Sequence, residues 1–160
     1  MLNLRSILIT FFFLPLLTVQ AETGADIVKS SGVQGGLIVH LGCGEGDLTM
    51  QLAVGDQYLV HGLDTNSETV QQARLNLAQV QKYGTVTAGV FDGEHLPYAD
   101  NLVNLIVVSD AAKVSRKEML RVLAPLGVIL QKQGGDWVRI TKSWPKAIDE
   151  WTHFLHGPNN

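Results

Sequence analysis

An apolar run that breaks into alternating glycines constrains this chain more than any other feature. Residues 37–46 read Leu-Ile-Val-His-Leu-Gly-Cys-Gly-Glu-Gly, a pattern typical of a buried strand that turns sharply toward a helix. Glycine has no Cβ, so it permits a tight turn or the close approach of a ligand to the backbone. The run therefore predicts a parallel sheet with a ligand site where this strand ends.

Acidic residues follow the next strands at spacings that suit such a site. The glycines form G-x-G-x-G rather than the dinucleotide pattern G-x-G-x-x-G. Asp64 ends an apolar strand over 58–63, twenty positions after Gly44, where a carboxylate can accept both hydroxyls of a ribose. Asp92 follows a strand over 86–91, and Asp110 closes a strand over 102–108 through Ser109. Together these spacings predict a crevice for an adenosyl cofactor at one edge of the sheet.

Helical segments alternate with these strands. We expect helices over 25–31, over 47–54, from Asn66 or Ser67 to Tyr83, and from Ser115 to the proline at 125. The last of these begins with a capping box made by Ser115 and Glu118. Strands separated by helices imply parallel pairing with right-handed crossovers. The expected fold is α/β, a Rossmann-like doubly wound and mostly parallel sheet of order 3-2-1-4-5.

The pattern changes after the fifth strand. A diglycine at 134–135 separates the strand-like runs 128–133 and 136–141, which predicts an antiparallel hairpin. The sixth strand would then be an antiparallel edge strand.

In these motifs the chain resembles a class I S-adenosylmethionine-dependent methyltransferase, of the kind called methyltransferase type 11. The resemblance covers about residues 35–133 and rests on segments 40–46, 62–64, 91–98 and 118–130. It implies S-adenosylmethionine as the cofactor and a small-molecule acceptor. Carried over by position, the cofactor-binding residues are His40, Gly42, Cys43, Gly44, Gly46, Asp64, Asp92 and Gly93.

The chain departs from that family at three places. His40 stands where the family usually has Asp or Glu, and a neutral imidazole would not pair with the ammonium of the cofactor as an acid does. Leu126 stands where the family has a first glycine after its proline, a change expected to matter little. The edge strand also replaces the last helix and strands of the family.

Two residues are candidates for a catalytic base, and the catalytic residue stays open between them. Asp110 ends a strand and could also cap a turn, whereas His95 follows Asp92 and could also be an ordinary solvated side chain. Cys43 has no general base beside it and is not expected to be a nucleophile. His153 and His156 supply too few ligands, so no metal site is predicted.

The amino terminus predicts export. Arg5 precedes an apolar segment over 7–19, which closes on a small-residue cleavage site at Ala21. The expected domains are a signal peptide over 1–21, a methyltransferase-like domain over 22–141, and a tail or linker over 142–160. A retained membrane anchor is the alternative to cleavage. After cleavage, a periplasmic or secreted location follows.

Composition excludes some partners. The formal charge is −3 and no run of Lys or Arg occurs, so nucleic acid is not an expected partner. The single cysteine excludes an internal disulfide.

The tail resembles the junction before a quinoprotein-like β-propeller in large exported bacterial proteins. Three hypotheses stay open: a small-molecule methyltransferase, a cofactor-binding domain without turnover, and a non-catalytic scaffold of a larger exported protein.

Overall fold

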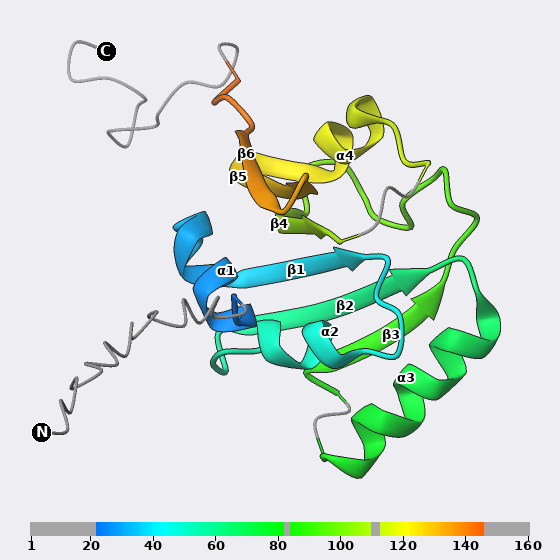
Figure 1. Cartoon of the computed structure of the whole chain (residues 1–160). Coiled ribbons are helices and arrows are strands. Elements are labelled where there is room, and N and C mark those ends of the chain that lie inside the picture. The colour runs from blue at the N-terminus through cyan, green and yellow to red at the C-terminus, as the bar shows by residue number, and fades with distance from the viewer. Residues whose placement is uncertain (1–21, 82–83, 110–112, 146–160) are drawn as a thin grey trace, which may run out of the picture.

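The computed structural model of the 160-residue chain describes residues 22–81, 84–109 and 113–145 (Figure 1). Helices and strands alternate along most of this length. Their bounds are α1 (Gly24–Ser31), β1 (Gly36–Leu41), α2 (Asp47–Leu52), β2 (Tyr58–Asp64), α3 (Ser67–Gln79), β3 (Val86–Val90), β4 (Val103–Val108), α4 (Arg116–Val122), β5 (Leu123–Gln133) and β6 (Asp136–Thr141).

The strands of the described residues form one sheet of order β3-β2-β1-β4-β5-β6. Strands β1 to β5 pair in parallel, and β6 pairs antiparallel with β5. Leu41 at the end of β1 lies between Leu63 of β2 and Val108 of β4, so three strands end at the same edge. The predicted fold class and strand order are confirmed.

Each face of the sheet carries its own core, because successive residues of a strand point to opposite faces. Ile38 belongs to the core that includes residues of α1, α2 and α3, whereas Val39 belongs to the core that includes Met119 of α4. Helices therefore cover both faces, as Figure 1 shows. Burial on both faces explains why the parallel strands read as continuous apolar runs.

Side-chain caps begin three of the helices. Thr23 and Asp26 form a capping box at α1, and the Asn66 side chain accepts hydrogen bonds at the start of α3. Ser115 caps α4 as predicted, but the Glu118 carboxylate is used elsewhere and the predicted capping box is not formed. These caps satisfy amide groups that a helix leaves without partners in its first turn.

Three helices end earlier than predicted, and the first of them, α2, ends at Leu52 instead of at residue 54. α3 ends at Gln79 instead of Tyr83, and Gln81 has a φ of +55°, which lies outside the right-handed helical region. Pro125 does not set the end of α4, because the chain passes at Leu123 directly into β5. The apolar periodicity of the sequence continues past the ends of α3 and α4, whereas the helical backbone geometry does not.

The predicted hairpin is confirmed. Gln133 faces Asp136 across a loop formed by Gly134 and Gly135, and both glycines have positive φ. A two-residue hairpin loop of type I′ requires that conformation at both positions. Within 22–81, 84–109 and 113–145, no helix is long and apolar enough to cross a membrane. The predicted signal peptide, Asp110 and the tail beyond 145 lie outside the described residues.

Candidate functional site

The glycine turn lies at the carboxyl end of β1. Gly42, Gly44 and Gly46 have φ values of +74°, +53° and +94°, which side chains rarely adopt. The amides of Gly42 and Cys43 both donate to the carbonyl oxygen of Leu63, at 2.9 and 3.2 Å. A Cβ built on Gly44 would meet no atom within 4 Å. The turn is thus tied to β2 and leaves open space beside Gly44.

Asp64 joins this turn to the next helix. Its Oδ2 accepts a hydrogen bond from the amide of Gly44 at 3.1 Å, and its Oδ1 accepts one from the amide of Asn66 at 3.1 Å. The side chain is half-buried at the end of β2. The structure therefore brings the predicted carboxylate and the predicted glycine turn into direct contact.

Gly62 makes this contact possible. A Cβ at Gly62 would lie 2.7 Å from the Cβ of Cys43 and 3.1 Å from the side chain of Thr49. Real Cβ atoms do not approach other atoms that closely, so only glycine lets the turn and α2 pack on β2. The glycine of the segment 62–64 has a packing reason that the sequence pattern did not disclose.

His40 is enclosed within the domain instead of facing solvent. The residue is 1% exposed; its Nδ1 lies 2.8 Å from Thr49 Oγ1 and its Nε2 lies 2.8 Å from Ser109 Oγ. Burial lowers the pKa of His40 to about 4, and the opposing effect of the Asp64 charge is smaller. The imidazole is therefore neutral near pH 7 and links α2 to the end of β4.

Asp92 organises the loop that follows β3. Its Oδ1 accepts hydrogen bonds from the amides of Glu94 and His95 at 2.8 and 2.7 Å, and its Oδ2 lies 2.9 Å from His95 Nδ1. These bonds hold the pKa of the Asp92 carboxyl at about 2. The same contact raises the pKa of His95, whose side chain is exposed. Asp92 is thus ionised and partnered within its own loop.

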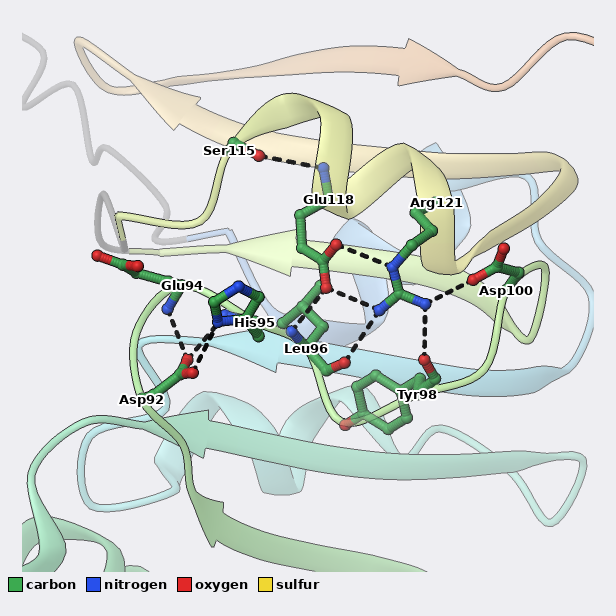
Figure 2. A network of polar contacts seen from close by, with 9 residues as sticks. All are labelled: Asp92, Glu94, His95, Leu96, Tyr98, Asp100, Ser115, Glu118 and Arg121. Atoms are coloured by element: carbon green, nitrogen blue, oxygen red, sulfur yellow. Dashed lines mark hydrogen bonds and ion pairs between the residues drawn. The ribbon is translucent and has the colours of Figure 1, made fainter.

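A polar network connects this loop to α4 (Figure 2). Arg121 pairs with both oxygens of Glu118, at 2.8 and 2.7 Å, and also reaches Asp100 at 2.6 Å. It donates further to the carbonyl oxygens of Leu96 and Tyr98, and Glu118 accepts from the Leu96 amide. The network fixes the loop between β3 and β4 against one face of α4.

The remaining predicted residues are distributed as follows. Gly46 precedes α2, and Gly93 has a φ of +87° next to Asp92. Burial raises the pKa of the Cys43 thiol to about 11, which keeps it protonated. No group of His, Cys, Asp and Glu able to hold a metal occurs among the residues that the structure describes.

Sequence reasoning missed three contributors to this region. Thr49 and Ser109 hold the His40 ring, and Arg121 holds the loop after β3. Glu118 and Arg121 are three apart on a helix, which is a recognisable pairing distance. No sequence signal shows, however, that the pair also binds backbone groups more than twenty residues away.

Comparison with known proteins decides the family. A family described as a methyltransferase domain matches residues 38–134, which include the glycine turn, Asp64 and α4. The chain belongs to this methyltransferase family. The prediction of S-adenosylmethionine as cofactor is confirmed at the level of the family. One of the similar structures, a geranyl diphosphate methyltransferase, was solved in complex with SAM.

Curated relatives of this methyltransferase domain match it in part. The ubiquinone/menaquinone biosynthesis C-methyltransferase UbiE of Azotobacter vinelandii is 34% identical over 112 residues, which are 64% of this chain and 44% of that protein. UbiE of Photorhabdus laumondii is 35% identical over 112 residues, 64% of this chain and 45% of its own length. The chain thus spans less than half the length of these relatives.

Solved structures share the fold at low identity. A SAM-dependent methyltransferase from Aquifex aeolicus has a TM-score of 0.55 at 20% identity, covering 68% of this chain and 62% of its own. The geranyl diphosphate methyltransferase has a TM-score of 0.61 at 15% identity, covering 68% and 46%. A [4+2]-cyclase, SpnF, has a TM-score of 0.59 at 22% identity, covering 69% and 46%. The fold alone therefore does not specify the reaction.

Proposed function

We propose that this methyltransferase domain transfers a methyl group from S-adenosylmethionine to a small-molecule acceptor. The observation that carries the proposal is the Asp64 carboxylate, held 3.1 Å from the amide of Gly44 at the shared end of β1 and β2. A fixed carboxylate beside a glycine turn suits a ribose whose hydroxyls need acceptors.

The residues at this edge fit the cofactor. Open space beside Gly44 leaves its backbone accessible, and a side chain there would enter that space. Gly42, Gly44 and Asp64 would hold the adenosyl group, with Asp92 and Gly93 on the neighbouring strand end. When bound, S-adenosylmethionine supplies an activated methyl group on its sulfonium. The chain must then align the acceptor and exclude water.

His40 would act in this site without carrying charge. Both of its ring nitrogens bond to hydroxyl oxygens, so the ring fixes the positions of Thr49 and Ser109. A neutral buried ring offers the cofactor no ion pair, and affinity would then rest on Asp64 and the backbone of the glycine turn.

An acceptor that must lose a proton needs a base. Of the two candidate bases, only His95 lies among the described residues. His95 is exposed beside Asp92, and that contact raises its pKa, so more of the ring is already protonated and cannot accept a further proton. Asp110 lies outside the described residues. The proposed reaction consequently depends chiefly on alignment of the acceptor.

Calorimetric titration of the full chain with S-adenosylmethionine and S-adenosylhomocysteine tests this proposal. Binding at micromolar concentration, on the order of −8 kcal/mol, is expected for the wild type. Asp64→Ala should abolish it, whereas Asp56→Ala, which removes an exposed carboxylate in the preceding loop, should not. A folded wild type that binds neither compound would contradict the proposal and favour the scaffold hypothesis.

Export and a further domain are proposals that rest on the sequence alone. We propose that residues 1–21 are removed as a signal peptide and that residues 142–160 link the domain to a β-propeller in a longer chain. Mass spectrometry of the periplasmic fraction should find an amino terminus at Glu22. Recovery of uncleaved chain in the membrane fraction would instead favour a retained anchor.

A further inference from the structure

A surface cavity lies between the loop after β3 and α4. Its volume is about 470 Å³, and it is lined by Glu94, His95, Lys113, Ser115, Lys117, Glu118 and Arg121. Figure 2 shows several of these side chains, with His95 on the loop and Glu118 and Arg121 on the helix facing it. None of the residues assigned to the adenosyl site lines this cavity, but His95 of the lining contacts Asp92, so the cavity adjoins that site without sharing a residue with it.

Arg121 and Glu118 cannot supply binding capacity to this cavity. Arg121 has five N–H donors, and all are used by Glu118, Asp100 and the two loop carbonyl oxygens. Glu118 is neutralised by the same pairing, which holds its pKa at about 2. The Arg121–Glu118 pair therefore lines the cavity without offering a ligand a free donor or an unpaired charge.

Lys113 and Lys117 are the groups left available. Both are exposed, and neither makes an ion pair or a hydrogen bond with any residue in the described part of the chain. Glu94 is the one carboxylate of the lining that is not paired with a described cation. His95 adds positive charge when protonated, a state that its contact with Asp92 favours. The available charge in the cavity is therefore positive.

The cavity also lies beside the edge where the cofactor is proposed to bind. Glu94 and His95 closely follow the end of β3, and Lys113 comes shortly after the end of β4. In open α/β sheets, ligands bind outside the carboxyl ends of the strands. An acceptor that reaches the methyl group from the α4 side would place part of itself in this cavity.

We propose that this cavity binds an anionic group, a carboxylate or a phosphate, through Lys113 and Lys117 with His95 beside them. Resting on the proposed function, we assign that group to the methyl acceptor, which makes the acceptor an anionic small molecule. Lysine ammonium groups bind oxyanions as mobile point charges, which suits a group shared by different acceptors.

Titration of the ¹⁵N-labelled full chain with inorganic phosphate, at constant ionic strength, tests the anion site. Saturable shifts are expected at the amides of His95, Lys113 and Lys117. The double variant Lys113→Ala/Lys117→Ala should weaken phosphate binding at least tenfold. The matched variant Lys29→Ala/Lys132→Ala removes the same charge from exposed positions elsewhere and should leave it unchanged. Shifts that do not saturate, or equal weakening in both variants, would overturn the site.

A labelling experiment separates an acceptor-borne anion from free phosphate. Labelled methyl groups from S-adenosylmethionine, incubated with the protein and a small-molecule extract, should enter a product that an anion exchanger retains. The double lysine variant should label it at least tenfold less. Label confined to unretained, neutral products would overturn the assignment to the acceptor while phosphate binding stands. Absence of all label, with phosphate binding intact, would contradict the proposed function and the assignment that depends on it.

Discussion

A buried imidazole such as that of His40 is tolerated only in its neutral form. The folded state lowers its pKa from an ordinary 6.5 to about 4, so the unfolded chain binds more protons between these pH values. The contribution of neutral His40 to the free energy of unfolding is fully present above pH 6.5 and is lost as the pH falls toward 4. The loss amounts to about 3 kcal/mol. His61, whose pKa is also lowered by burial, adds to the same trend.

Urea denaturation at pH 7.5 and pH 5 measures this effect. His40→Gln should lose stability at pH 7.5 but show a smaller difference between the two pH values than the wild type. His95→Gln is the control, because the pKa of that exposed histidine is raised and its titration cannot cause loss on acidification. An undiminished pH difference in His40→Gln would contradict the assignment.

Leu126 holds a backbone conformation that suits glycine. Its φ is +63° and its side chain is 60% exposed, so it bears conformational strain without burying its apolar surface. Leu126→Gly should therefore raise the free energy of unfolding by about 1 kcal/mol. Leu126→Ala keeps the strained φ and should give no gain. Equal midpoints for the two variants in thermal denaturation would show that strain is absent.

At the scale of elements, the Arg121 network sets how α4 and the loop after β3 fit together. Arg121→Ala removes the partner of a Glu118 side chain that is only 15% exposed, and it frees the loop carbonyl oxygens. The free energy of unfolding, measured by urea denaturation, should fall, because the Glu118 carboxylate and the loop carbonyl oxygens lose their donor. Hydrogen exchange at the Leu96 amide, which donates to Glu118, should become faster. Arg116→Ala, at an exposed position of the same helix, should change neither quantity.

The β5–β6 hairpin tolerates substitution at one of its two glycines better than at the other. Gly134 has a φ of +60° and Gly135 a φ of +110°, and a Cβ on either would meet nothing within 4 Å. Asparagine accepts the first conformation, so Gly134→Asn should be nearly neutral. Gly135→Ala should cost about 1 kcal/mol or more, because alanine avoids positive φ. Similar denaturation midpoints for both variants would contradict this reading of the turn.

At the scale of the whole molecule, the sequence predicted the arrangement of helices and strands better than it predicted contacts between individual side chains. The hairpin and most strand positions followed from periodicity and glycine placement, which are local signals, whereas the order of the sheet was expected from the doubly wound fold that alternating strands and helices imply. The placement of Asp64 at the same edge as the glycine turn also followed, because parallel strands bring their carboxyl ends together, although its hydrogen bond with the Gly44 amide was not predicted. The enclosure of His40 by Thr49 and Ser109 did not, since it depends on packing between α2 and β4. The early end of α3 likewise depends on a backbone angle that composition does not reveal.

The reactivity of the Cys43 thiol can be used to measure opening of the glycine turn. Its thiol is 4% exposed, and with a pKa of about 11 it is a thiolate in roughly one molecule in ten thousand at pH 7. A thiol reagent can therefore react at a useful rate only when the glycine turn opens. The rate of alkylation would time that opening at the point where the cofactor is proposed to bind, in the natural sequence and without an added label.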